Sequence, residues 1–359
     1  MTAVADMPER RSEGRMVRSG ALVAYAAVGL SLAAILTLSV GATGISLTSL
    51  PRVLLAMATG NDAGAVAREQ LVLIDIRLPR LLLGMFVGAA LAVSGAMMQG
   101  MFRNPLADPG LIGVSSGAAL AAVATIALGN GVAAPWLRPL GAYALPVAAF
   151  AGGLATTLVL TTAVQRHGSL SLATLLLAGI ALAAFNGALM GLVAYASDDR
   201  ELRDLTLWML GSLSGASWPK VFATTPFALL VAVTLPGLVR GLNGLLLGEA
   251  EAFHLGIDVE RTKRLIVLVA SAAVGAAVAV AGIVGFVGIV VPHLVRLMAG
   301  PDHRVVLPAS ALLGAILVLI ADMLARMLVR PAELPLGVVM ALIGAPIFLH
   351  MVVKRRVAG

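Results

Sequence analysis

The chain has 359 residues, of which 60% are apolar and only 12% are charged. A soluble domain carries about twice that charged fraction, so a water-soluble enzyme is excluded. Cysteine is absent, which excludes disulfides, thiolate metal sites and a cysteine nucleophile. The net charge of +7 comes from Lys and Arg scattered at the ends of apolar runs, and there is no basic stripe of the kind that binds nucleic acid.

Ten apolar segments are candidates for bilayer-spanning helices, each of which takes about 20 residues. They lie at roughly 20 to 40, 81 to 101, 112 to 128, 142 to 164, 172 to 195, 221 to 239, 265 to 282, 284 to 298, 305 to 322 and 335 to 353. The least distinct boundary is the Gly-rich apolar turn between the seventh and the eighth, so the number of spans is about ten. We expect an all-α integral membrane protein with a single transmembrane domain over residues 20–356.

The N-terminal region is basic, with Arg10, Arg11, Arg15 and Arg18 ahead of an apolar run longer than that of a cleaved signal peptide. We expect residues 1–19 to be a cytoplasmic tail and the run to be a retained first span. With the N-terminus inside, more than half of the Lys and Arg fall on inner segments. The positive-inside rule therefore favours two cytoplasmic termini.

Pairs of glycines four residues apart recur within the segments. They are Gly84 with Gly88, Gly113 with Gly117, and Gly187 with Gly191. Such pairs let helix backbones approach closely in a membrane. We expect most of them to pack within one subunit.

The energy for any transport by this chain must enter outside these segments. Away from their last three residues, they contain no Asp, Glu, Lys or Arg, whereas ion-driven transporters usually bury an ionisable group near the midplane. An ion- or proton-coupled carrier is therefore disfavoured. None of Lys220, Lys263 and Lys354 follows a glycine, so the chain lacks the G-K-[ST] of a nucleotide-binding P-loop. If the chain belongs to a pump, a separate ATPase drives it.

Residues 248–264 have the pattern of a cytoplasmic docking element for such an ATPase. Two short helical stretches are broken at Gly256, with acids in the first and bases closing the second. A short amphipathic helix of this kind seats in a groove of a partner. Glu249, Glu251, His254 and Gly256 are the candidate contacts, and an ordinary solvated loop is the alternative.

Carboxylates at Asp198, Asp199 and Asp204 superficially offer a magnesium-diphosphate site, as in a membrane prenyl transferase. Such an enzyme would need two acidic clusters facing one cavity, whereas this one is single and interleaved with arginines. We expect a solvated external loop that leads into a short interfacial helix around Leu205 to Leu213, and no catalytic residues.

A set of ordered strings runs from residue 77 to the C-terminus. They include Arg77-Leu-Pro-Arg80, Arg103-Asn-Pro-Leu-Ala-Asp-Pro-Gly110, Gly113-Val-Ser-Ser-Gly117, Gly282-Ile-Val-Gly-Phe-Val-Gly288 and Glu333-Leu-Pro-Leu-Gly337. These strings resemble the permease subunits of bacterial ABC importers for ferric siderophores, haem and vitamin B12. The resemblance implies a type II importer permease in the inner membrane. It would form a homodimer of ten-helix subunits with two cytoplasmic ATPase subunits and one periplasmic substrate-binding protein.

The run from Met98 to Ala122 is most similar to haem permeases, so we expect haem as the cargo, with ferric siderophores and cobalamin left open. The histidines fall at or near the cytoplasmic ends of the segments, at His167, His254, His293, His303 and His350. No His or Tyr is placed mid-path as an evident axial ligand of haem iron. Haem is therefore expected as a transported substrate, without a permanently bound cofactor or metal, and ATP would bind the partner subunit.

The resemblance also implies roles for individual residues. Arg77, Arg80 and Arg326 correspond to outward-facing arginines that grip glutamates of the binding protein. Alternatively, these arginines snorkel to lipid headgroups, or Arg326 pairs with Asp322 four residues earlier.

Asn104 and Leu106 after the second segment, with Ser171 and Leu172 before the fifth, resemble the family's cytoplasmic gate, and plain helix ends are the alternative. Met97, Met98 and Met101 are candidates for lining the path, because Met is polarizable and adaptable. A Met cluster in a helix is more often part of the packing.

Overall fold

The computed structural model describes residues 7–39, 55, 69–129, 131, 133–165, 172–329 and 331–357. These residues are almost entirely helical and contain no strand. Each predicted segment corresponds to one helix. The ten helices are α1 (Met7–Ser39), α4 (Leu78–Phe102), α5 (Val114–Leu128), α7 (Ala144–Gln165), α8 (Leu172–Ala196), α10 (Trp218–Leu247), α12 (Val259–Ala281), α13 (Val287–Ala299), α14 (His303–Met327) and α15 (Leu336–Val357).

Among the residues that the structure describes, seven helical stretches are long and apolar enough to cross a membrane, and three shorter apolar ones lie at Val114–Leu128, Val287–Ala299 and Leu336–His350. The boundary between the seventh and eighth segments, which is the least distinct in the sequence, separates two helices. α12 ends at Ala281, and α13 begins only after Gly282 and Phe286, whose φ angles are +69° and +67°. Left-handed backbone at both positions breaks the helix.

Several helices run beyond the predicted segments, because those were bounded at charged residues. α1 already begins at Met7, inside the expected tail. A π-helical turn, Val72–Arg77, precedes α4, and α10 continues through Arg240 to Leu247. A helix continues through a charged residue whose side chain reaches water or a partner.

The prediction of an acidic loop before a short helix is wrong in detail. Asp198 is the N-cap of helix α9 (Asp199–Met209), where its side chain accepts a hydrogen bond from the N–H of Glu201, and the Glu201 side chain accepts one from the N–H of Asp198. This capping box starts the helix six residues earlier than expected. Of the acids that resembled a metal site, Asp198 caps this helix, Asp199 begins it and Asp204 lies further along it.

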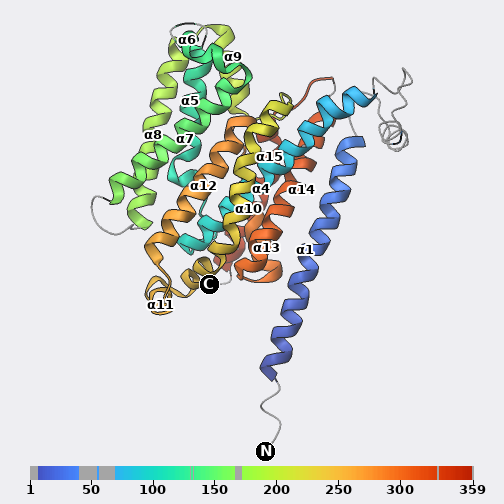
Figure 1. Cartoon of the computed structure of the whole chain (residues 1–359), viewed down its shortest axis with the longest axis vertical. Helices are drawn as coiled ribbons and strands as arrows, with labels where there is room; N and C mark the ends of the chain where they lie inside the picture. The colour runs from blue at the N-terminus through green and yellow to red at the C-terminus, as the bar shows by residue number, and fades with distance from the viewer. Residues whose placement is uncertain are drawn as a thin grey trace, which may run out of the picture.

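α4 lies at the centre of the bundle, with α10, α12, α13 and α14 packed around it, and α5, α7 and α8 form a second group to one side (Figure 1). The glycine pairs on α4 and α5 make close contacts, as predicted. A Cβ at Gly88 would overlap the carbonyl oxygen of Gly314 on α14, and one at Gly117 would overlap Thr156 on α7. Gly187 and Gly191 on α8 differ, since nothing lies within 4 Å of a Cβ at either position.

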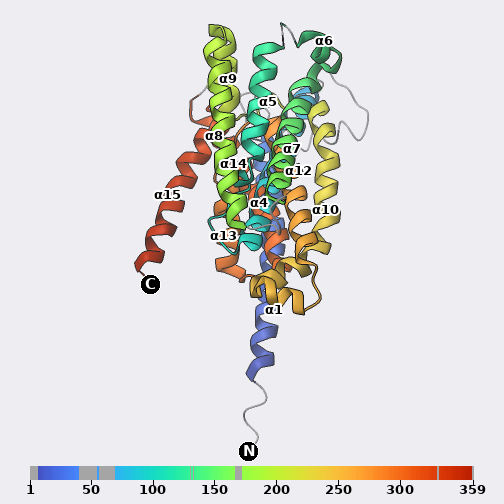
Figure 2. The same ribbon diagram turned by 90° about the vertical axis from the view of Figure 1, so that its left-hand side faces the viewer.

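The molecule has two distinct ends (Figure 1). Helix α9 lies at one, here called the α9 end, and the short helix α11 (Glu249–His254) lies at the other, the α11 end. α1 begins and α15 finishes at the α11 end, and α15 leans away from the rest of the bundle (Figure 2).

Candidate functional site

At the α9 end, Arg80 is held by two carboxylates. Its guanidinium donates to both oxygens of Asp322 on α14, at 2.8 to 3.1 Å, and to both oxygens of Glu333, at 2.9 and 3.1 Å. A planar guanidinium matches two carboxylates in this forked geometry. Arg80 therefore joins the start of α4 to the end of α14 and to the turn before α15.

Arg326 shares the same carboxylate. Its Nε lies 3.1 Å from Oδ2 of Asp322, which is the pairing at four-residue spacing that the sequence offered as an alternative. Arg77 is buried and donates to the carbonyl oxygen of Leu38 at the end of α1. All three predicted docking arginines thus have contacts within the subunit, and their role in docking stays a prediction.

The expectation that charged residues lie only where the segments end needs correction. Asp322 lies within α14, five residues before its end, with its side chain only 2% exposed, and Arg296 lies within α13. Charges at these depths are retained because each has bonded partners. The segments were drawn from apolar runs alone, which do not reveal such pairs.

Arg296 is the centre of a polar network at the α11 end. It donates to the side-chain oxygen of Gln99 and to the carbonyl oxygen of Ala96 on α4, and its Nη2 lies 3.4 Å from Nε2 of His303. The Gln99 amide donates in turn to the carbonyl oxygen of Gly288, at 3.2 Å. Because Pro292 has no N–H, that carbonyl lacks its usual helical donor, and Gln99 supplies one.

The network continues to α10 through the fully buried His303. Oδ1 of Asn243 accepts from both Nδ1 and the backbone N–H of His303, at 2.9 Å each, so the ring proton is on Nδ1. Nδ2 of Asn243 donates to Asp302 at 2.7 Å. Burial favours a raised pKa for Asp302, but the N–H of Arg304, the Asn243 amide and nearby positive charge together lower its pKa.

The predicted gate is partly described. α4 ends at Phe102, and Arg103 caps it with a φ of +51°. Oδ1 of Asn104 accepts from the N–H of Leu106 at 3.0 Å, an Asx turn that leaves the Leu106 side chain exposed. Ser171, and the side chain of Leu172, lie outside the described residues.

The three methionines proposed for the path lie in the packed interior of the subunit. Met97, Met98 and Met101 are almost completely buried among the residues of the main apolar core. This burial favours the packing role that the sequence left as the alternative, and path lining stays a prediction.

The coupling segment consists of α11, a turn at Gly256 with a φ of +75°, and the first turn of α12. Glu249 is anchored to the segment's own end, since its carboxylate lies 2.7 Å from the buried Lys263. Glu251, His254 and Gly256 are exposed.

Sequence reasoning missed two apolar side chains of this segment. Phe253 is 71% exposed and Leu255 is 53% exposed, on an element held in place by the buried Ala252 and Ile257. The signal that was available is an apolar pair inside a charged, non-spanning segment. Exposed apolar groups next to charges are typical of a surface that binds a partner.

The described architecture has known counterparts, and residues 29–354 match the model of the FecCD transport family. The chain belongs to this family. The hemin transport system permease protein HmuU of Yersinia pestis is 48% identical over 287 residues, which cover 79% of this chain and 83% of that protein. The cobalamin import system permease protein BtuC of Halobacterium salinarum is 44% identical over 307 residues, which cover 86% and 80%.

A solved inward-facing structure of an ABC transporter, described as being of the metal-chelate type, has a TM-score of 0.80 and 32% identity to this chain. The match covers 93% of this chain and 99% of the solved one. The chain is therefore the permease subunit of an ABC importer, a multi-pass protein of the inner membrane. Membership of this family implies an ATPase and a substrate-binding protein as partners.

Proposed function

We propose that this permease imports haem, which it receives from a periplasmic binding protein and moves with energy from a separate ATPase. The observation that carries the proposal is the 48% identity to a hemin permease over 79% of the chain. The relatives named for cobalamin are 44% identical, so a large macrocycle of either kind fits the family, and haem is the cargo that the nearer similarity supports.

The test is uptake into liposomes that hold the permease with its partner ATPase and are supplied with the cognate binding protein. Haem, cobalamin and a ferric siderophore are supplied separately, with ATP inside or outside the vesicles. We expect ATP-dependent uptake of haem that continues after the proton gradient is collapsed. Uptake of cobalamin or siderophore with haem excluded would overturn the cargo, and uptake that stops with the gradient would overturn the energy source.

The proposed orientation of the subunit in the membrane follows from the different surfaces at its α11 and α9 ends. The ATPases bind the α11 end through Phe253 and Leu255, with Glu251, His254 and Gly256 beside them and Glu249 holding the segment to Lys263. Both termini are then cytoplasmic, and the binding protein docks at the α9 end, where Arg77, Arg80 and Arg326 lie. The side chains at Asn104 and Leu106, with Ser171 and Leu172, are proposed to gate the cytoplasmic exit.

The proposed homodimer is supported by α8. Ile180, Ala184, Gly187 and Gly191 follow one another at helical spacing and are all exposed. The two glycines have nothing within 4 Å of a Cβ, unlike the pairs on α4 and α5. A glycine pair four residues apart on an apolar helix is a close-packing surface. A second subunit is the proposed occupant of this face.

A further inference from the structure

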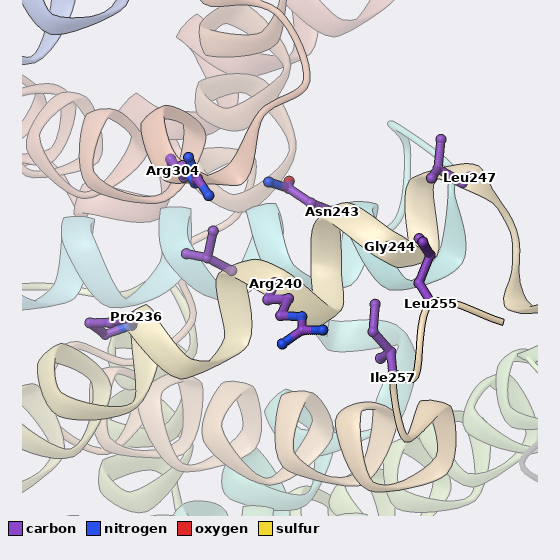
Figure 3. A pocket seen from close by; sticks show the side chains of 9 residues that line it. Pro236, Arg240, Asn243, Gly244, Leu247, Leu255, Ile257 and Arg304 are labelled. Atoms are coloured by element: carbon purple, nitrogen blue, oxygen red, sulfur yellow. The ribbon is translucent and has the colours of Figure 1, made fainter. Parts of the chain in front are cut away.

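A cavity of about 450 Å³ opens at the α11 end between α10, the turn after α11 and the start of α14 (Figure 3). Arg240 and Arg304 line it from two different helices, and Asn243, which donates to Asp302, lines it as well. The rest of the wall is mostly apolar and includes Val239, Leu247 and Leu255, so the cavity borders the proposed ATPase-binding surface.

Neither arginine is held in an ion pair by the carboxylates of the described residues. Among the residues that the structure describes, the guanidinium groups of Arg240 and Arg304 form no ion pair with Asp or Glu. Asp302, two residues before Arg304, accepts at Oδ1 from Asn243 at 2.7 Å and from the backbone N–H of Arg304 at 2.9 Å, and it forms no ion pair with either guanidinium among the described residues. The cavity therefore combines two exposed cations with an apolar wall.

Helix α10 gives the depth of Arg240 in a membrane and the helical face on which its side chain lies. Phe222, Leu229 and Val233 are exposed apolar residues of this helix, and their spacing puts them on the same helical face as Arg240. From Phe222 to Arg240 the helix rises roughly 27 Å at its 1.5 Å per residue, close to the ~30 Å of a bilayer's hydrocarbon core.

The start of α10, at the other end of this exposed face, has the residues typical of a membrane–water interface. Trp218 lies one turn before Phe222, with the two ring centroids 5.8 Å apart, and Trp is enriched where a helix leaves the hydrocarbon. With Trp218 and Phe222 near one interface, Arg240 lies on the lipid-facing side at the depth of the opposite headgroups.

We propose that this cavity binds the headgroup of an anionic phospholipid from the inner leaflet. The phosphate lies between Arg240 and Arg304, and the glycerol and upper acyl chain run along Val239 and Leu247. Arginine forks bind phosphate oxygens in pairs, and basic pockets between membrane helices on the cytoplasmic side hold anionic headgroups. The choice of leaflet rests on the proposed orientation, whereas headgroup selectivity is independent of the cargo.

The experiment is native mass spectrometry of the delipidated full-length chain, titrated with phosphatidylglycerol or with phosphatidylethanolamine of the same acyl chains. The wild type is expected to prefer phosphatidylglycerol. The double variant Arg240→Gln/Arg304→Gln is expected to bind it about 30-fold more weakly, with each single variant about fivefold weaker. Binding of phosphatidylethanolamine is expected to stay unchanged.

The matched control is Arg200→Gln/Arg203→Gln, which removes two exposed arginines from α9 at the opposite end. Equal loss of phosphatidylglycerol binding in this control, or no preference between the two lipids in the wild type, overturns the proposal. If the double variant keeps its lipid but no longer associates with the ATPase, the cavity is instead a docking surface for an acidic protein segment. The single variants carry the same test if the double variant does not fold.

Discussion

Asp322 links two arginines that are far apart in the sequence. Its oxygens accept from Arg80 on α4 and Arg326 on α14, and its side chain is only 2% exposed. In a low-dielectric environment, a buried cation that loses its counter-charge keeps its desolvation penalty. Loss of the Asp322 carboxylate should therefore lower the free energy of unfolding more than loss of a surface ion pair does.

Replacement by the isosteric amide tests this point. Asp322→Asn is expected to lower the free energy of unfolding by about 3–5 kcal/mol, because Arg326 loses its counter-charge and Arg80 keeps only Glu333. Thermal unfolding in detergent is the measurement. Glu333→Gln serves as the comparison, since the Glu333 side chain is 38% exposed and should contribute about 1 kcal/mol or less. Equal effects of the two substitutions would show that burial does not set the strength of this network.

The two ion pairs of Asp322 differ in whether the sequence could predict them. The contact between Arg326 and Asp322 was available as an alternative because the residues are four apart on one helix. The contact between Arg80 and Asp322 spans 242 positions, and no local pattern encodes it. The same holds for Gln99 and Arg296, 197 positions apart, since both depend on which helices pack together.

At the scale of elements, a close helix crossing joins α4 to α14. Gly88 and Gly314 meet there, and each occupies the space that a Cβ on the other would need. The sequence marked Gly88 as part of a close-packing pair but did not identify its partner helix.

A matched pair of glycine substitutions tests this crossing. Gly88→Ala is expected to destabilise the protein by about 1–3 kcal/mol, since the new methyl group forces two packed backbones apart. Gly187→Ala, with nothing within 4 Å of the added carbon in the single subunit, is expected to leave the stability of the isolated subunit unchanged or raise it by up to about 1 kcal/mol through helix propensity. Thermal unfolding of both variants decides, and destabilisation by Gly187→Ala alone would contradict the helix pairing described here.

α11 makes a separate prediction. Phe253→Ser combined with Leu255→Ser removes the two exposed apolar groups and should weaken binding of the ATPase about tenfold or more, as loss of an interface hot spot does. The subunit itself should fold normally, because neither side chain is buried. Co-purification of the ATPase is the measurement, with Leu202→Ser on α9 as a control at the other end. Undiminished co-purification would exclude these residues from the interface.

The elements themselves were largely predictable, and their ends were not. Apolar runs located all ten helices because a bilayer-crossing backbone must satisfy its own hydrogen bonds. Helix ends depend on caps, as at Asp198, and on charged residues that a helix can contain, as at Arg240, and a count of apolar residues ignores both. The exposed pair at Phe253 and Leu255 was missed for a related reason, since two apolar residues among charges do not form a run.

At the scale of the whole molecule, the exposed apolar surface has two kinds of face. α10 presents large side chains such as Phe222 and Val233, the latter 77% exposed, and such a face is suited to fluid lipid. α8 presents Gly187 and Gly191 beside Ala184, a narrow surface that allows close approach of another helix. The difference predicts which face meets the second subunit.

Because the chain contains no cysteine, single cysteines report on this interface without background. Ala184→Cys should give a cross-linked dimer with a short bifunctional maleimide in native membranes, whereas Val233→Cys on the lipid-facing side of α10 should not. Adding Gly187→Leu to Ala184→Cys should abolish the cross-link, since a large side chain prevents close approach of the backbones, while the unfolding temperature of the subunit stays near that of wild type. Cross-linking at Val233→Cys with none at Ala184→Cys would place the second subunit against α10. In that case the arginine-lined cavity beside α10 would face protein instead of lipid, so the same pair of cysteines also tests the membrane exposure that the lipid site requires.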